Sequence, residues 1–407
     1  RWVHVRHEES AAFAAAADAA LTGQLAVVAG SCGPGNLHLI NGLYDANRSR
    51  VPVLAIAAHI PTNEIGTGYF QETHPQELFR ECSVYVEYVA DPKQMPRLLE
   101  IAMRAAIEQR GVAVLVIPGD VALAEIADDR AVVIERSHPV IVPSGDELAR
   151  AATLLNASKK TTILAGAGVE GAHDEVIALA DRLGAPIVHA LRGKEFIEYD
   201  NPFDVGMTGL LGFASGYRAM EAADTLLVLG SDFPYEQFYP EHATTIQVDI
   251  RGSQLGKRHP LDLGLVGDVR ATVEALLPRL AEKSDRDHLD DSTAHYRKTR
   301  AKLDDLATPT KAGRPIHPQY LARLLDEQAA DDAVFTADVG SPTVWAARYL
   351  SMTENRRLIG SFTHGSMANA LLHGIGAQVS HPDRQVIALA GDGGLALMLG
   401  ELLTLTQ

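Results

Sequence analysis

One aspartate near the end of the chain stands among glycines, in the run Gly391-Asp392-Gly393-Gly394, directly after the apolar segment 385–390. A carboxylate oxygen is a ligand that Mg²⁺ prefers, and glycines allow a ligand to approach the backbone closely. The free N–H groups at the start of a following helix favour phosphate oxygens. The pattern therefore favours a Mg²⁺ ion that bridges a diphosphate, although an ordinary tight turn between a strand and a helix fits the same residues.

A second candidate lies at the other end of the chain, where Arg6-His7-Glu8-Glu9 follows the alternating segment 2–5. Segment 2–5 is predicted to be a strand, and a carboxylate at its carboxyl end would face the crevice where ligands bind in doubly wound sheets. Acidic residues are also common at helix starts, because they complement the helix dipole. Both interpretations of Glu8 stay open on these residues alone.

Several glycine-rich loops follow apolar runs that are predicted to be strands. The loop 30–35 could line a cofactor or simply turn the chain. The run Gly166-Ala167-Gly168-Val169-Glu170-Gly171 fits a dinucleotide-binding pattern if it opens a helix. Loops 206–212 and 230–235 come next, and Asp249 ends a further predicted strand, where an acid could bind a ribose. Three such loops in one unit indicate a large, extended ligand.

These loops need elements to hold them, and apolar runs alternate with amphipathic helical patterns along most of the chain. Such alternation predicts parallel sheets covered on both faces. The pattern lapses around 120–145 and over the charged stretch 282–310, which we interpret as linkers. We therefore predict an α/β protein of three doubly wound parallel-sheet domains, truncated at both ends. The predicted domains are 1–125, 140–285 and 310–407.

Composition limits the class of protein. A formal net charge of −16 over 407 residues argues against non-specific binding of nucleic acid. The two cysteines, Cys32 and Cys82, support neither a disulfide framework nor a zinc site, so a reducing cytoplasm is expected. No apolar run is long enough to span a bilayer.

Taken together and in this order, the motifs resemble the thiamine-diphosphate enzymes of the pyruvate oxidase and acetolactate synthase group. Within that group the match is to the flavin-dependent, quinone-reducing pyruvate oxidases. The stretches that carry the resemblance are 6–9, 29–43, 68–82, 189–195, 204–210, 344–349, 365–370 and 391–394.

The resemblance implies a pyrimidine-binding domain, a central FAD-binding domain and a diphosphate-binding domain, and it implies roles for particular residues. Glu8 would be the catalytic acid that bonds the aminopyrimidine ring of thiamine diphosphate, and burial would keep it protonated or let it share a proton. Asp392 would bind Mg²⁺, and the family's second protein ligand for the metal would lie downstream of this chain. Further thiamine-diphosphate contacts would be Gly365, Ser366, Met367, Gly393 and Gly394. FAD contacts would be Gly166, Gly168, Thr208, Gly209, Leu210, Leu211, Ser231, Asp232, Phe233, Pro234, Tyr235 and Asp249. Substrate contacts would be Phe70, Gln71 and Val339.

The implied activity is oxidative decarboxylation of pyruvate to acetate and CO₂, with electrons passing through FAD to a quinone. The resemblance further implies a homotetramer with active sites between subunits, located in the cytoplasm and peripheral to the inner face of the cell membrane. The alternatives are a phosphate-using oxidase, a carboligase like acetolactate synthase with structural FAD, and an inactive flavin-binding fragment.

Overall fold

A computed structural model describes residues 2–126 and 133–406 of the chain. Internal contacts divide it into two compact units. The first unit comprises residues 1–138, 333–343 and 357–407, and the second comprises residues 139–332 and 344–356. Every pairing of strands in the three sheets is parallel, which confirms the predicted fold class. The predicted domain boundaries stay a prediction.

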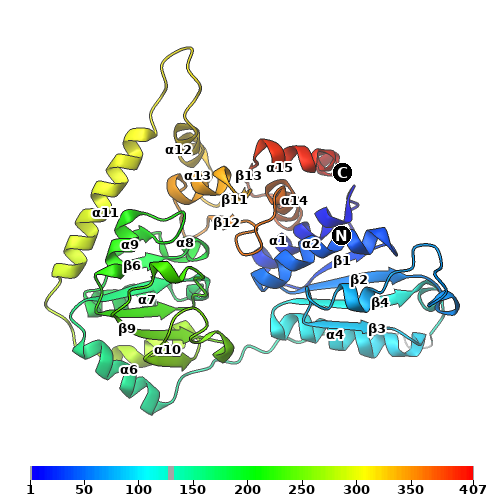
Figure 1. The fold of residues 1–407 in the computed structure, drawn as a ribbon, viewed down its shortest axis with the longest axis horizontal. Coiled ribbons are helices and arrows are strands. Elements are labelled where there is room, and N and C mark those ends of the chain that lie inside the picture. Colours follow the sequence, from blue (N-terminus) through cyan, green and yellow to red (C-terminus); the bar gives the residue numbers. More distant parts are fainter. Residues whose placement is uncertain (1, 127–132, 407) are drawn as a thin grey trace. The chain divides into compact units, whose positions relative to one another are not determined.

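The first unit contains a four-stranded sheet in the order β1-β2-β4-β3 (Figure 1). Its strands and helices are β1 (Ala26–Gly30), β2 (Val53–His59), β3 (Tyr85–Tyr88), β4 (Val112–Pro118), α1 (Glu8–Thr22), α2 (Pro34–Ser49), α3 (Pro75–Leu78), α4 (Met95–Gln109) and α5 (Gly119–Ala122). Alternate residues of β2 and β4 point to opposite faces of the sheet. Val53 and Val114 pack with α1 and α2, whereas Leu54 and Leu115 pack with α4, so both faces are covered.

A three-stranded sheet in the order β12-β11-β13 completes the first unit. Its elements are β11 (Val334–Ala337), β12 (Arg357–Ile359), β13 (Val386–Leu389), α14 (Asn369–Ser380), α15 (Asp392–Leu397), the 3₁₀ segment Leu399–Thr406 and the start of α13 (Ser341–Tyr349). Helix α14 packs on α1 through Phe13 and Ile375, which are both buried. The backbones approach closely at Gly376, where an added Cβ would lie 2.1 Å from the carbonyl oxygen of Ala14.

The second unit is built on a six-stranded sheet in the order β10-β9-β8-β5-β6-β7. Its elements are β5 (Thr161–Ala165), β6 (Ile187–His189), β7 (Asp204–Met207), β8 (Thr225–Leu229), β9 (Thr244–Asp249), β10 (Leu263–Val266), α6 (Gly145–Ala157), α7 (His173–Leu183), α8 (Lys194–Ile197), α9 (Ala214–Glu221), α10 (Val269–Leu276), α11 (Asp287–Leu306) and α12 (Pro318–Gln328). Ile163 and Leu227 lie in the core with α6, α7 and α10, while Leu164 and Leu226 lie in the core with α9. The sheet is therefore doubly wound.

Some local predictions were wrong. Residues 2–5 form no strand in the structure. The stretch 282–310 contains the 20-residue helix α11, whose apolar face is narrow: Leu289 is buried and Tyr296 packs against the core that contains Val205. Strand β13 is only partly buried, because it lies at the edge of its sheet. Of the predicted linker at 120–145, residues 127–132 lie outside the described residues.

Candidate functional site

Glu8 is the first residue of α1, which agrees with the helix-start interpretation of this residue. Its Oε2 lies 3.0 Å from Nδ1 of His38, which belongs to α2. Its Oε1 lies over Gly35, where an added Cβ would be only 2.9 Å away. Glycine at position 35 therefore leaves room for this carboxylate, and one carboxylate oxygen is held by a protein partner.

The ionisation of Glu8 differs from the prediction that burial keeps its proton. Burial alone raises the pKa of Glu8, but the side chain is 31% exposed and burial is outweighed. The hydrogen bond with His38, a backbone hydrogen bond, and the favourable electrostatic interactions with His38 and His7 together lower the pKa below its usual value of 4.5. The Glu8 carboxyl group is therefore ionised at neutral pH.

Asn41 joins the first helices to the loop before α14, where Gly365, Ser366 and Met367 were predicted to contact a cofactor. Its Nδ2 donates to Oε1 of Glu9 at 2.6 Å and to Oγ of Ser366 at 2.9 Å. Its Oδ1 lies 2.8 Å from Nε2 of His364. The backbone N–H groups of Gly365 and Ser366 both donate to Oγ of Ser361. This loop is thus fixed from two sides within the first unit, while Met367 is 51% exposed.

The predicted metal loop follows β13, and Asp392 opens α15 with its side chain exposed. Sequence reasoning missed the residue that organises this loop, Asp338, which is 2% exposed at the end of β11. Asp338 accepts hydrogen bonds from the backbone N–H groups of Ala370 at 2.9 Å and Gly391 at 3.0 Å. An added Cβ at Gly394 would lie 2.1 Å from Oδ2 of Asp338, so this glycine is required by close packing. The position of Asp338, immediately after a buried strand, was the signal that could have identified it.

Among the predicted substrate residues, Gln71 lies against the glycine loop 30–35. Its Oε1 accepts a hydrogen bond from Sγ of Cys32 at 3.2 Å, and an added Cβ at Gly33 would lie 2.8 Å from Cβ of Gln71. Phe70 is 79% exposed beside it, and Val339 is half-buried after Asp338. The carboxylate of Glu72 shapes the loop of Phe70 and Gln71 by accepting three backbone N–H groups.

The second unit brings the predicted flavin residues to one edge of one sheet. Gly166, Thr208 and Ser231 follow β5, β7 and β8, and Asp249 ends β9. Because all six strands are parallel, their carboxyl ends meet at the same edge. Asp249 is 4% exposed and its Oδ1 accepts the backbone N–H of Arg251 at 2.9 Å.

Two buried hydroxyl groups at this edge have no hydrogen-bond partner among the described residues, Oγ1 of Thr208 and Oγ of Ser231. Both residues are 3% exposed, and a buried polar group without a partner is costly. The unpaired hydroxyls therefore fit a site for a polar ligand.

The loops that carry these hydroxyls also contact each other. An added Cβ at Gly209 would lie 2.8 Å from the ring of Phe233, which meets Tyr235 edge to face. Nε of Arg348 donates to the carbonyl oxygen of Leu211 at 3.1 Å, and Asp232 is paired with Arg258 at 2.7 Å. Leu210 and Pro234 are exposed.

The glycine pattern at 166–171 does not open a helix directly. Residues Ala167–Val169 form a 3₁₀ turn, and α7 begins only at His173. An added Cβ at Gly166 would lie 2.4 Å from the carbonyl oxygen of Gly230. An added Cβ at Gly168 would lie 2.6 Å from the Cα of Gly230. These glycines are explained by packing between the loops after β5 and β8.

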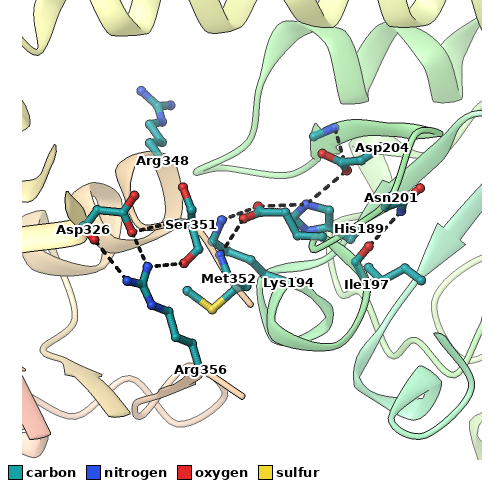
Figure 2. Close-up of polar contacts among 12 residues, drawn as sticks. His189, Lys194, Ile197, Asn201, Asp204, Asp326, Arg348, Ser351, Met352 and Arg356 are labelled. Atoms are coloured by element: carbon teal, nitrogen blue, oxygen red, sulfur yellow. Dashed lines mark hydrogen bonds and ion pairs between the residues drawn. The ribbon is translucent and has the colours of Figure 1, made fainter. Parts of the chain in front are cut away.

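Beneath these loops lies a buried cluster of ionisable residues, which Figure 2 shows around His189, Lys194 and Asp204. Nε2 of His189 lies 3.5 Å from Oδ1 of Asp204 and 3.7 Å from Oε2 of Glu198. Lys194 also pairs with Glu198. Burial and the charge of Glu198 raise the pKa of Asp204 to about 7, and burial lowers the pKa of His189 to about 4. The cluster therefore holds a neutral imidazole beside a carboxyl group that titrates near neutral pH.

The described residues contain no group of three or more His, Cys, Asp or Glu side chains arranged to hold a metal ion. None of the helices in this part of the chain is long and apolar enough to cross a membrane.

Comparison with known families matches three models in order along the chain. The N-terminal TPP binding domain of thiamine pyrophosphate enzymes matches residues 1–78, the central domain matches residues 148–276, and the C-terminal TPP binding domain matches residues 338–407.

Similar proteins agree with these models. A 42.6 kDa uncharacterised protein of Pseudomonas amyloderamosa is 61% identical over 77% of this chain and 80% of its own length. YdaP of Bacillus subtilis, named for containing thiamine pyrophosphate, is 38% identical over 99% of this chain and 70% of its own length. The pyruvate oxidase of Lactiplantibacillus plantarum is 31% identical over 100% of this chain and 68% of its own length. Acetolactate synthases are among the further relatives, at 27% to 30% identity.

Proposed function

The chain belongs to the thiamine pyrophosphate enzyme family, and from this membership we propose that it catalyses the oxidative decarboxylation of pyruvate to acetate and CO₂. Thiamine diphosphate, Mg²⁺ and FAD are the proposed cofactors, and a quinone is the proposed electron acceptor. The observation that carries the proposal furthest is the carboxylate of Glu8, which has one oxygen held by His38 and the other over Gly35.

The cofactors supply the difficult chemistry when bound: thiamine diphosphate accepts the electron pair released as CO₂ leaves a 2-oxo acid, and FAD takes up two electrons. Glu8 would bond the aminopyrimidine ring and exchange a proton with it. A carboxylate that is already ionised suits the accepting part of this exchange, and the fixed rotamer lowers the entropic cost of meeting the ring.

The diphosphate end would be held by the loop after β13. Asp392 is exposed and offers the carboxylate oxygens that Mg²⁺ prefers, and the N–H groups of Gly393 and Gly394 lie in the first turn of α15. Asp338 would keep this loop against the start of α14 through its bonds to Gly391 and Ala370. Ser366, Gly365 and Met367 would complete the contacts, with Phe70, Gln71 and Val339 facing the substrate.

The flavin would bind at the carboxyl edge of the six-stranded sheet, and the unpaired buried hydroxyls of Thr208 and Ser231 support this. Asp249 would bond a ribose, as acids at strand ends do in dinucleotide sites. The aromatic rings of Phe233 and Tyr235 offer apolar surface beside them. Gly166 and Gly168 would line the site through their backbone.

We also propose the assembly and location that the family resemblance implied. The protein would be a homotetramer with Glu8 and Asp392 of one active site supplied by different subunits. It would be cytoplasmic and would visit the inner face of the membrane to reduce its quinone.

The test is an assay of the complete protein with pyruvate, thiamine diphosphate, Mg²⁺ and an artificial electron acceptor. Acetate formed in step with reduced acceptor supports the proposal. Lack of turnover in a preparation that contains FAD and binds thiamine diphosphate would refute it.

A carboligase like acetolactate synthase is the second candidate, because acetolactate synthases are among the relatives. Product analysis separates the two, since a carboligase makes acetolactate without reducing the acceptor. A phosphate requirement would instead indicate an oxidase that forms acetyl phosphate.

A further inference from the structure

Two histidines accompany Glu8, and the function proposed above uses His38 only as a hydrogen-bond partner of Glu8. The ring of His7 is stacked on the ring of His38, with centroids 4.2 Å apart and planes 21° from parallel. Nδ1 of His38 lies 3.0 Å from Oε2 of Glu8. The three side chains therefore form a short row in which the middle ring contacts both of its neighbours.

The fold fixes the His7 end of this row. The backbone N–H groups of Arg6 and His7 each donate to Oε1 of Glu401 at 2.9 Å, and Glu401 is 1% exposed. Nδ1 of His7 accepts the N–H of Glu9 at 3.3 Å, so His7 caps α1 while its ring supports His38. These bonds hold the His7 ring on which His38 stacks.

The tautomer of His38 follows from its neighbours. Glu8 is ionised at neutral pH and can only accept, so Nδ1 of His38 must carry the hydrogen of this bond. Nε2 is then the basic nitrogen, and 44% of the side chain is exposed to solvent. The imidazole thus has one nitrogen on the carboxylate and a second one that can exchange protons with water.

Other ionisable groups around His38 come from three elements. The segment before α1 contributes His7. The 3₁₀ segment Leu399–Thr406 contributes Glu401, which accepts the backbone N–H of His7. Helix α1 contributes Glu8 and Glu9, and Glu9 is engaged by Asn41 of α2 at 2.6 Å. Glu8 is therefore the acid that bonds the His38 ring directly.

From this geometry we propose that His38 positions Glu8 and relays protons between its carboxylate and solvent. The proposal deepens the function proposed above and rests on it. In one direction Nδ1 gives its proton to Oε2 of Glu8 while Nε2 takes a proton from a solvent water, which leaves as hydroxide, so the ring stays neutral overall. The reverse transfer returns the Glu8 proton to solvent, and no oxidant or further reactant is needed.

The closing experiment uses the complete protein and compares His38→Ala, His38→Gln and His242→Gln. Glutamine can still donate a hydrogen bond to Glu8 but cannot pass a proton through, and His242 is a matched histidine whose side chain is 95% exposed. Two readouts are taken from pH 5.5 to 8.5. The first is kcat with pyruvate, and the second is the rate at which bound thiamine diphosphate exchanges its thiazolium C–H proton for deuterium without substrate.

We expect His38→Ala to lose on the order of 10²-fold in both rates, as for one proton-transfer group. Added imidazole should restore part of the loss, in a saturable and pH-dependent manner. His38→Gln should bind thiamine diphosphate like the wild type in calorimetric titration, yet stay slow and unresponsive to imidazole. His242→Gln should match the wild type throughout.

The proposal is overturned if His38→Gln keeps wild-type rates, because relay through an amide is impossible. It is also overturned if the loss in His38→Ala is equal at every pH and imidazole restores none of it. Should His38→Ala fail to fold, His38→Gln alone decides the outcome. A wild type that exchanges the thiazolium proton but ignores pyruvate would refute the proposed substrate, and the exchange rates of the variants would still test the relay.

Discussion

The buried carboxyl group of Asp204 makes the stability of the second unit depend on pH. Asp204 is 7% exposed, lies within reach of Glu198 and His189, and has a pKa raised from 3.8 to about 7. In the folded chain it therefore keeps its proton over a range where the unfolded chain loses it. Unfolding between pH 4 and pH 7 releases a proton, so stability falls as pH rises through this window.

The magnitude follows from the size of the shift. Three pKa units correspond to about 4 kcal/mol, lost between pH 4 and pH 7. Asp204→Asn removes this titration while Oδ1 can still accept the N–H of Gly206, which Asp204 bonds at 3.1 Å. We therefore expect the difference in unfolding free energy, mutant minus wild type, to rise by about 4 kcal/mol from pH 4 to pH 8.

The assay uses the intrinsic tryptophan fluorescence of the chain. It has two tryptophans, Trp2 in the first unit and Trp345 in the second, so a Trp2→Phe background reports on the second unit alone. A rise of about 4 kcal/mol corresponds to a change of roughly 10 °C in the difference between melting temperatures for a unit of this size. Asp305→Asn, at an exposed aspartate of α11, is the matched control. A difference that stays flat from pH 4 to pH 8, as for Asp305→Asn, would refute the reasoning.

Three other expectations concern the first unit. Glu8→Gln in the complete protein should lower kcat by about 10² to 10⁴-fold, the usual effect of one acid–base group, and an unchanged rate would remove Glu8 from the mechanism. Asp392→Ala should weaken the binding of Mg²⁺ and thiamine diphosphate in calorimetric titration while the FAD absorbance persists; intact affinity would contradict its role as a ligand. Gly394→Ala should destabilise the first unit by about 1–3 kcal/mol in urea unfolding, because its Cβ would strike Oδ2 of Asp338, and equal stability would show that the loop can move aside.

The pattern of apolar runs was sufficient to predict three parallel sheets, because strands buried on both faces read as continuous apolar segments. The apolar runs 161–165 and 225–229, for example, coincide with strands β5 and β8. Helix α11 was missed, since its few buried positions, such as Leu289, leave little periodicity in a charged sequence. Segment 2–5 alternates like a strand but forms no ladder in the structure, and alternation cannot reveal whether a partner strand pairs with it.

Sequence alone determined which residue types stand at the ends of strands, and this was enough to single out Glu8, Asp249 and Asp392 as candidates. Tertiary structure decided what each carboxyl group contacts, and contacts set ionisation and orientation. Glu8 was expected to keep its proton, yet a histidine 30 residues away lowers its pKa. Asp338 belongs to no motif found in the sequence, yet it bonds the starts of α14 and α15, which are far apart from it in sequence. Long-range hydrogen bonds and burial depend on how the chain folds back on itself, and local spacing does not contain that information.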